Sequence, residues 1–509
     1  MPIEDESLLL DRYLAAWPEP AIGDSLALAD QSRRYTYREL FDAVGRCAGW
    51  LRMAGVRQGD RVALAMERSA DHAICILGTM AAGACPCPLE PRLGVEEAQR
   101  RTRVARLRWI VFDAANEAEA GQSGIAPERR LSRTDPAPAP PFWSRELGPQ
   151  SDGFLLFTSG SSGKPKGVLQ NHGGLLANSL GVMRHTGLDS SDKLLHIMPL
   201  HHTNGVNNQL LAPLLAGSSV VIAGRFRAES MPELLERHSP TILTGVPTMF
   251  ARMLPLAFPR ESLSSLRMLR CGSASITEEL HRRIEEKFGL PLVISYGLSE
   301  ATCTSTMNPP AQRKVGSVGT PLQGQSVFLR GADGAPVRES GSEGEICIAG
   351  PTLMTGYLLD DAPDPQPPGE VLRTGDLGRF DEEGYLFITG RLKDVIIRGG
   401  ENLSPNLIEE AMATIPGVAG CCVVGKAHAD LGEVPVAFVV RQAGEEGEAL
   451  EPRALAATIG ARLSRIHVPA EFFFVESLPE NATGKVDRKK LREVACGPEG
   501  SAAPGSGAS

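Results

Sequence analysis

The residues from Leu155 to Gly167 read L-L-F-T-S-G-S-S-G-K-P-K-G, and the interpretation of the whole chain starts from them. The apolar run that ends at Phe157 predicts a buried strand, and the small residues after it predict a loop. Glycines let several backbone N–H groups point into one concavity, and hydroxyls with Lys164 and Lys166 add donors and positive charge. This chemistry suits a polyphosphate.

The loop differs from a Walker A loop. Its spacing, Gly160-x-x-Gly163-Lys164-Pro165, is shorter, and no serine or threonine follows the lysine. A loop rich in glycine and serine is, by itself, often only a flexible turn. The motifs further along the chain must therefore decide between a turn and a phosphate site.

Composition limits the class of protein. With 509 residues the chain exceeds one ordinary core, so two or more domains are expected. A net charge of -9 argues against a nucleic-acid-binding protein. The first residues are acidic and no apolar run is long enough to cross a bilayer, so we expect neither a signal peptide nor stable membrane insertion, and a cytoplasmic enzyme. The ten cysteines lack metal-site spacing and predict reduced thiols without a structural metal.

Strand and helix patterns alternate through the first four fifths of the chain, which predicts an α/β fold with mainly parallel sheets flanked by helices. Residues 59–65 predict a turn that leads into a buried strand, and residues 74–84 predict a helix. Later, Ser404-Pro405 predicts the start of a helix, and residues 421–424 and 434–440 predict buried strands. The last part is therefore predicted to be a smaller α+β domain.

The loop at 155–167 closely resembles the signature loop of the adenylate-forming superfamily, which includes acyl-CoA synthetases, aryl-CoA ligases, peptide-synthetase adenylation domains and luciferases. Further motifs follow in the order and at the spacing of that family, so the resemblance extends over nearly the whole chain. They are Pro199-Leu-His-His-Thr-Asn-Gly205, Ser295-Tyr-Gly-Leu-Ser-Glu-Ala301, Arg373-Thr-Gly-Asp376, Arg391-Leu-Lys-Asp-Val-Ile-Ile-Arg-Gly-Gly-Glu-Asn402 and Pro479-Glu-Asn-Ala-Thr-Gly-Lys-Val-Asp-Arg488.

The resemblance implies two domains joined by a hinge. Residues 1–392 would bind ATP and the acid, and residues 393–496 would form a small mobile cap that carries the catalytic lysine, with the hinge at Lys393. Residues 497–509 are rich in glycine, alanine and serine and are predicted to be a disordered tail.

The resemblance also assigns roles to individual residues. Lys485, Glu300 and His202 would be catalytic, with Glu300 as the ligand of Mg²⁺. ATP would be bound by Thr158, Ser159, Gly160, Ser161, Ser162, Gly163, Lys166, Ser273, Ala274, Tyr296, Gly297, Ser299, Asp376 and Arg391. Four residues depart from the usual motifs: His201 stands where the family has an aromatic residue, Ser299 replaces a threonine, and Glu480-Asn481 replaces a basic and a small residue.

The acyl pocket is the least determined part of the site. By resemblance it includes His202, Gly245, Gly272, Gly297, Thr302 and Cys303. These residues are small or weakly polar, and none is an arginine or lysine that could pair with a second carboxylate. We therefore expect a hydrophobic or bulky acid, aliphatic or polycyclic, rather than a dicarboxylic acid.

The implied reaction is the activation of a carboxylic acid by ATP to an acyl adenylate, followed by transfer of the acyl group to a thiol. CoA is the expected acceptor, with Gly399, Gly400 and Glu401 at its channel. A ligase that loads a separate acyl carrier protein is the closest alternative, and a luciferase-like oxygenase is a more distant one. A non-catalytic acyl-nucleotide sensor should have lost Lys485, Glu300 or the loop lysines, and all of them are present.

Overall fold

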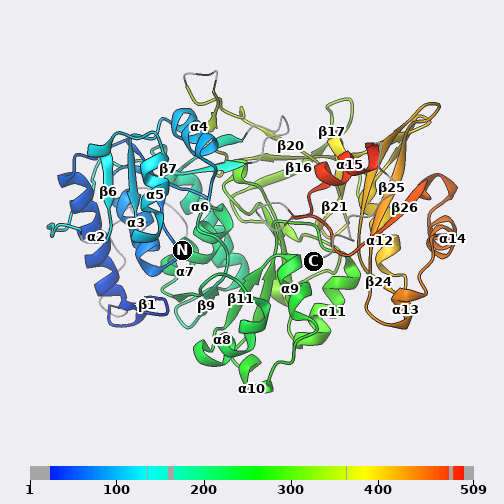
Figure 1. Cartoon of the computed structure of the whole chain (residues 1–509), viewed down its shortest axis with the longest axis horizontal. Coiled ribbons are helices and arrows are strands. Elements are labelled where there is room, and N and C mark those ends of the chain that lie inside the picture. The colour runs from blue at the N-terminus through cyan, green and yellow to red at the C-terminus, as the bar shows by residue number, and fades with distance from the viewer. Residues whose placement is uncertain are drawn as a thin grey trace, which may run out of the picture.

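A computed structural model describes residues 23–134, 136–158, 165–360, 362, 364–480 and 485–497. A large domain is followed by a smaller one at the C-terminal end of the chain (Figure 1). Residues Ser159 to Lys164 of the predicted phosphate loop lie outside the described residues. So do residues 498–509, most of the predicted disordered tail.

A nine-stranded sheet forms the centre of the large domain, in the order β15-β14-β13-β12-β11-β9-β10-β1-β2. The six strands from β13 to β1 pair in parallel and are buried on both faces, as parallel sheets require. The strands are β1 (Leu26–Ala29), β2 (Arg34–Thr36), β9 (Lys193–His196), β10 (Ser219–Ile222), β11 (Ile242–Gly245), β12 (Met268–Cys271), β13 (Leu292–Tyr296), β14 (Thr306–Met307) and β15 (Thr320–Pro321).

A second sheet, β4-β3-β5-β6, is parallel throughout. Its strands are β3 (Arg61–Ala65), β4 (Cys85–Pro88), β5 (Trp109–Phe112) and β6 (Arg130–Ser132), so the strand predicted within residues 59–65 is confirmed. The predicted helix at 74–84 is confirmed as part of α3. The helices of the large domain are α2 (Tyr37–Met53), α3 (Ala70–Ala81), α4 (Val95–Ala105), α5 (Glu117–Gln122), α6 (His172–Thr186), the π-helix η3 (Asn204–Leu211), α7 (Ala212–Leu215), α8 (Met231–His238), α9 (Pro247–Met253), α10 (Arg260–Leu263) and α11 (Glu278–Phe288).

Two antiparallel sheets complete the large domain. The first contains β7 (Asp152–Thr158), β8 (Lys166–Asn171) and β19 (Gly356–Leu358). The second contains β16 (Ser326–Arg330), β17 (Pro336–Val337), β18 (Glu343–Ala349), β20 (Leu372–Phe380) and β21 (Leu386–Arg391). Three of the predicted motifs lie on these strands: one follows the end of β7, Arg373–Asp376 lies within the first part of β20, and Arg391 ends β21.

The small domain has its own core, which includes Ile408, Val423 and Ala437. Proline at the first position of α12 and the two predicted strands are confirmed, although the Ser404 hydroxyl donates to the Thr389 carbonyl instead of capping the helix. The elements are β22 (Ile396–Arg398), β23 (Glu401–Leu403), α12 (Pro405–Ala413), β24 (Val418–His428), β25 (Gly432–Arg441), α13 (Glu445–Glu448), α14 (Pro452–Arg462), β26 (Glu471–Val475) and α15 (Arg488–Cys496). Within the described part of the chain, no helix has both the length and the apolar character needed to span a membrane.

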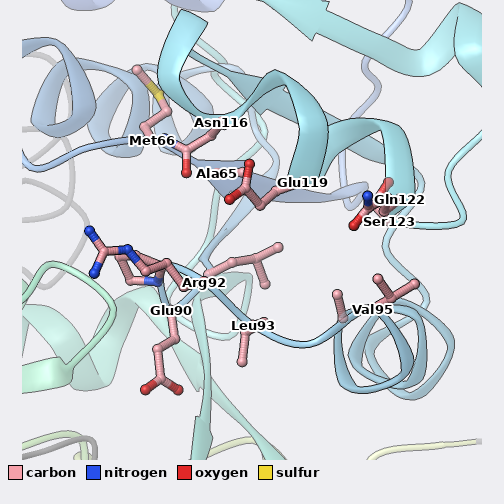
Figure 2. Close-up of a pocket in the computed structure, with 13 residues that line it drawn as sticks. Ala65, Met66, Glu90, Arg92, Leu93, Val95, Asn116, Glu119, Gln122 and Ser123 are labelled. Carbon is pink, nitrogen blue, oxygen red and sulfur yellow. The ribbon is translucent and has the colours of Figure 1, made fainter. Parts of the chain in front are cut away.

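A pocket lies in the four-stranded-sheet region (Figure 2). Its walls come from the segment after β4, which includes Glu90 and Arg92, from the start of α4 at Val95, and from α5 at Glu119. None of the residues predicted to bind nucleotide or acid lines it. The candidate active site is therefore elsewhere, between the nine-stranded sheet, the antiparallel sheets and the small domain.

Candidate active site

Strands β7 and β8 hold the base of the predicted phosphate loop. They run antiparallel, and Thr158 at the end of β7 faces Lys166 at the start of β8. A hydroxyl group and an ammonium group are thus fixed at the two ends of the loop. Of the loop residues predicted to bind ATP, Ser159, Gly160, Ser161, Ser162 and Gly163 lie outside the described part of the chain.

Glu300 is connected to Lys166 through Tyr357. Glu300 lies in a 3-10 turn (η5, Ser299–Ala301) directly after β13, and Tyr357 lies in β19. The Tyr357 hydroxyl donates a hydrogen bond of 2.8 Å to Glu300 Oε1. The Lys166 ammonium nitrogen lies 4.8 Å from the centre of the Tyr357 ring, a cation–π contact.

The surroundings of Glu300 fit Mg²⁺. Among the described residues, no group of three or more His, Cys, Asp and Glu side chains gathers that could hold a metal ion alone. Mg²⁺ is usually bound by one or two carboxylates together with the phosphates of a nucleotide. A carboxylate that accepts one hydrogen bond keeps further lone pairs for a cation, so Glu300 has the required chemistry.

Asp376 is held by two protein groups. The Tyr296 hydroxyl donates to its Oδ2 atom at 2.7 Å, and Arg391 Nε donates to its Oδ1 atom. The pairing of β20 with β21 sets Asp376 opposite Arg391, so the sheet register itself brings the two together. Asp376 is buried, yet each carboxylate oxygen can accept a second hydrogen bond. A fixed carboxylate of this kind can receive the two hydroxyls of a ribose.

Lys485 of the small domain faces this group of residues. Surrounding protein and the charge of Arg391 lower the pKa of Lys485, while Asp376 and Glu300 act in the opposite direction. Lys485 in turn contributes to a lowered pKa of His202. The lysine still reaches solvent. Five predicted residues that are widely spaced in the sequence thus meet where the two domains approach each other.

Two polar contacts hold the domains in this arrangement. Arg252 of α9 forms an ion pair of 2.8 Å with Glu480, five residues before Lys485. The backbone N–H of Glu278, at the start of α11, donates to Glu410 Oε2 of α12 at 3.3 Å. Figure 1 shows α9 and α11 beside the small domain. The acidic Glu480, which departs from the usual motif, thereby gains a partner in the large domain.

His201 and His202 are neutral at physiological pH. Burial lowers the pKa of His202 to about 4, with help from the charges of Lys485 and Arg101. Burial and the neighbouring His202 lower the pKa of His201 to about 2. The two ring centres lie 4.4 Å apart. His202, which the Lys485 charge reaches, is therefore a neutral imidazole beside the catalytic residues.

Two glycines of the predicted acyl pocket serve protein packing. A Cβ atom on Gly297 would lie 1.9 Å from the Cys303 carbonyl oxygen, and one on Gly272 would lie 2.6 Å from Ser295 Oγ. The Thr302 side chain donates to the Thr352 carbonyl at 2.6 Å. The space beside these glycines is filled by the chain itself, so their small size does not make room for a bulky acid. The contact at Gly245 is looser, since a Cβ atom there would lie 3.2 Å from the Phe250 ring.

Ser273 and Ala274 follow β12 and lie at the same end of the sheet as Gly245. Ser273 has a φ of 69°, and its hydroxyl receives a hydrogen bond of 3.3 Å from the Asn204 side chain. Ser299 and the turn after it are fixed from β8, because Gln170 Nε2 donates to the Ser299 carbonyl at 2.8 Å. The predicted ATP residues on β12 and β13 are thus tied to the elements around them.

The predicted CoA segment lies apart from the catalytic residues. Gly399 and Gly400 form the turn between β22 and β23 with φ values of 60° and 89°, which favour glycine. The Gly399 N–H donates to the Leu431 carbonyl within the small domain. No hydrogen bond or ion pair between described residues joins Gly399, Gly400 or Glu401 to the large domain. In this arrangement Lys485, and not the glycine turn, is presented to the site.

Sequence reasoning missed two side chains in this region. Tyr357, which contacts both Glu300 and Lys166, lies in a short Gly-Tyr-Leu strand without a distinctive pattern. Arg270 lies inside the strand Met268–Cys271, whose burial is complete. A charged residue within a four-residue buried strand was the available signal for Arg270, but sequence alone does not show which face of the sheet the side chain occupies.

Comparison with known proteins gives the family. Residues 19–358 match the model of the AMP-binding enzymes, and residues 407–485 match that of the AMP-binding enzyme C-terminal domain. The chain is 34% identical over 502 residues to a sulfoacetate–CoA ligase of Cupriavidus necator, covering 94% of this chain and 95% of that protein. It is 33% identical over 502 residues to an indoleacetate–CoA ligase of Aromatoleum aromaticum, covering 92% and 94%.

The solved structures agree. ATP-bound MatB from Rhodopseudomonas palustris superimposes with a TM-score of 0.87 at 28% identity, over 96% of this chain and 98% of that one. Both domains are included in this similarity, so the α/β fold with a smaller C-terminal domain is confirmed. The chain belongs to the AMP-binding enzymes, the adenylate-forming superfamily, and within it to the acid–thiol ligases of the acyl-CoA ligase type.

Proposed function

We propose that the protein activates a carboxylic acid with ATP and transfers the acyl group to CoA. In the first step a carboxylate oxygen attacks the α-phosphorus of ATP, and pyrophosphate leaves. In the second step the CoA thiolate attacks the acyl carbon, and AMP leaves. The observation that carries the proposal is the position of Lys485, which the small domain brings to Glu300, Asp376 and Arg391.

The first step requires two anions to meet, and the cationic groups answer that requirement. Lys485 would offset the charge that carboxylate and α-phosphate share. Lys166, with Thr158 and the loop between them, would hold the pyrophosphate end of ATP. Tyr296 would offer its ring face to the adenine, Asp376 would accept the ribose hydroxyls, and Arg391 would hold the nucleotide.

Mg²⁺ would be held by Glu300 together with the phosphates and would offset part of their charge. The Tyr357 hydrogen bond fixes the orientation of the Glu300 carboxylate before the nucleotide arrives. Ser299, adjacent to Glu300, would donate its hydroxyl to the α-phosphate.

The second step would use the other side of the small domain. We place the boundary between domains 1–392 and 393–496 at Lys393, which is exposed between β21 and β22, and propose it as the hinge. Rotation there would withdraw Lys485 and bring the turn at Gly399, Gly400 and Glu401 toward the acyl adenylate. Neutral His202 would accept a hydrogen bond from the incoming thiol. ATP and CoA are both available in the cytoplasm, where we expect the reaction.

The acid is a separate question. The relatives include ligases named for an anionic acid, sulfoacetate, and for an aromatic acid, indoleacetate, so their names do not select one class. The sequence-based expectation of a hydrophobic or bulky acid rested on small pocket residues and on the lack of a basic one. Gly272 and Gly297 are small because protein atoms lie against them, and Arg270 adds a buried basic side chain. The structure therefore gives no support to a hydrophobic preference.

Pyrophosphate release tests the proposal. Wild-type protein is assayed with ATP, Mg²⁺ and a broad panel of aliphatic, aromatic and anionic acids, with and without CoA. Replacing Lys485 with alanine is expected to lower acid-dependent pyrophosphate release about 100- to 1,000-fold. The matched control is Lys489→Ala, an exposed lysine one turn further on, which should retain wild-type rates.

The outcomes separate the acceptors. Acyl-CoA that appears only with CoA supports the ligase. Adenylate that forms while CoA is never consumed would point instead to a separate acyl carrier protein. If the wild type binds ATP but releases no pyrophosphate with any acid of the panel, the result would contradict the catalytic assignment and favour an acyl-nucleotide sensor.

A further inference from the structure

Arg270 is a buried cation whose own chain leaves it without hydrogen-bond partners at two atoms. It is the third residue of β12, in the centre of the nine-stranded sheet, and is 2% exposed. Among the described residues, neither its Nε nor its Nη1 atom has a hydrogen-bond partner. Burial of a charged group without partners is costly, so such a position normally has a function or a ligand.

Among the residues that the structure describes, no acidic side chain forms an ion pair with Arg270. Asp192 is the one carboxylate whose charge influences its pKa, and Asp192 is occupied by two hydrogen bonds of 2.7 Å from Arg267 and by one from Thr241. Burial lowers the pKa of Arg270 to about 10. The guanidinium group therefore remains charged at neutral pH, next to the second positive charge of Arg267.

The strand directs Arg270 toward the predicted acyl region. Its neighbours Leu269 and Cys271 belong to the hydrophobic cluster on one face of the sheet, so Arg270 points to the opposite face. The register partner of Arg270 on β11 is Thr244, which lies on that same face. The thiol of Cys303, a predicted acyl-pocket residue, is a further electrostatic neighbour of the guanidinium group.

This face of the sheet is covered by a polar layer. Asn204, at the start of η3, donates to Ser273 near the end of β12. Asn208 donates 2.9 Å to the Thr304 hydroxyl. The Thr244 hydroxyl and the Asn208 carbonyl oxygen are buried without partners among the described residues. Buried polar groups are almost always hydrogen-bonded in a working protein, so these atoms leave positions on this face where a polar ligand would find partners.

Arg270 and the turn at Glu300 share Cys303 as a neighbour. The backbone of Cys303 packs directly against Gly297, in the turn that leads to Ser299 and Glu300. Cys303 thus separates the catalytic turn from the guanidinium group. An acid that binds both groups would extend from Lys485 past Cys303 to Arg270.

We propose that Arg270 binds a second anionic group of the acid, a carboxylate or a sulfonate, at the end remote from the reacting carboxylate. The inference rests on the proposed ligase function and names the substrate class of that site. A guanidinium group suits both anions, because it keeps its positive charge and its Nε and Nη1 donors have no partner among the described residues.

The experiment compares acids in matched pairs. Dicarboxylic acids of three to six carbons and the corresponding ω-sulfo acids are each assayed beside the monocarboxylic acid of the same chain length, by pyrophosphate release. Wild-type protein should prefer one anionic series by at least about 100-fold in kcat/KM. Whether the carboxylate or the sulfonate series is preferred identifies the second anion.

Two variants and a control test the role of the residue. Arg270→Met is similar in length and uncharged. Its kcat/KM for the anionic acid should fall about 100- to 1,000-fold, and its kcat/KM for the matched monocarboxylic acid should stay the same or rise. Arg270→Lys should lose less. Arg283→Met, at an exposed arginine of α11, should behave as wild type.

Thermal unfolding supplies a readout that does not depend on catalysis. The anionic acid alone should raise the unfolding temperature of wild type and not of Arg270→Met, and the unliganded variant should be at least as stable as wild type. The inference is overturned if the wild type prefers monocarboxylic acids. It is also overturned if Arg270→Met lowers kcat/KM equally for the anionic and the monocarboxylic acids. In both cases the ligase function stands. If no acid is turned over, the result counts against the ligase function. If, in addition, no anionic acid raises the unfolding temperature of the wild type, this inference is overturned as well.

Discussion

The proposed nucleotide end and the proposed acid end of the site are built differently. At the nucleotide end, Asp376 is held by Tyr296 and Arg391, and Glu300 by Tyr357. At the acid end, Arg270 and its polar neighbours retain buried atoms without partners among the described residues. Groups that are oriented in advance suit a substrate that never changes, which here is ATP. Buried polar groups without protein partners suit the acid, which must be selected, because a wrong acid would leave these groups without hydrogen bonds.

The contact between the two ends should be the most sensitive point. Gly297 belongs to the nucleotide motif, and the Cys303 carbonyl that packs against it belongs to the acid end. Gly297→Ala would place a methyl group 1.9 Å from that oxygen, so backbone must move. We expect a loss of about 3 kcal/mol in stability and of nearly all activity. Thermal unfolding and pyrophosphate release measure both.

The control for this substitution is Gly420→Ala, where an added Cβ meets no atom within 4 Å. It should leave the unfolding temperature nearly unchanged. If Gly297→Ala were equally well tolerated, the two ends would not be coupled through this contact.

The nucleotide end is tested by Asp376→Asn. The substitution removes the charge that pairs with Arg391 and one acceptor for Tyr296. We expect kcat/KM for ATP to fall about 100-fold, while the preference among acids stays the same. Initial rates with varied ATP and with two acids check this. Glu382→Gln, at an exposed residue of the turn after β20, is the control, and a changed acid preference in Asp376→Asn would contradict the separation of the ends.

A smaller effect is expected at Tyr357. Tyr357→Phe removes the hydrogen bond to Glu300 and keeps the ring beneath Lys166. Because Glu300 then loses its fixed orientation, we expect about a tenfold loss in rate and a higher Mg²⁺ concentration for half-maximal activity. Binding of Mn²⁺ in the presence of a non-hydrolysable ATP analogue, followed by electron paramagnetic resonance, gives a second readout.

Tyr385→Phe offers a matched control. The Tyr385 hydroxyl also donates to a protein acceptor, the Gln312 carbonyl, and its ring also lies beneath a lysine, Lys314. Neither partner belongs to the Glu300 contact. It should leave the metal requirement unchanged. Equal Mg²⁺ dependence of Tyr357→Phe and wild type would remove Tyr357 from the nucleotide end.

The smallest effect concerns the domain contact that presents Lys485 to both ends. Burial raises the pKa of Glu410 from 4.5 to about 7, and the carboxylates of Glu278 and Glu409 add to this. If docking of the two domains causes that burial, docking at a pH between 4.5 and about 7 is accompanied by uptake of a proton by Glu410. It therefore becomes weaker as the pH rises from about 4.5 to 7 and stays weak above 7.

Glu410→Gln imitates the protonated form at every pH. Relative to wild type, its rate of adenylate formation should be equal near pH 5 and a few times higher at pH 8. The ratio of the two rates is the quantity to measure, because the titration of groups common to both proteins cancels. A ratio that does not change with pH would place the burial of Glu410 within the small domain.

Much of the fold followed from local patterns. Strand and helix periodicity predicted the parallel sheets, and Ser404-Pro405 predicted the start of α12. The motif order identified the residues that meet around Lys485, because each motif occupies a strand end or turn whose form depends on a few adjacent residues. Spacing along the chain carries that information.

Properties of the acid end depended on tertiary structure. Gly272 and Gly297 looked like space for a ligand, but the atoms that fill that space come from Ser295 and Cys303. Tyr357 and Glu300 are 57 positions apart and meet through the fold.

The sequence by itself was enough to identify an α/β ligase, and its short contiguous motifs predict a nucleotide loop and a catalytic lysine. Only the tertiary structure decided that Arg270 points away from the hydrophobic cluster and that its Nε and Nη1 atoms have no partner in the described part of the chain. The physical reason is that strand pairing sets which face a side chain occupies and which distant residues become its neighbours. The net charge around a buried side chain is the sum of the charges of those neighbouring residues.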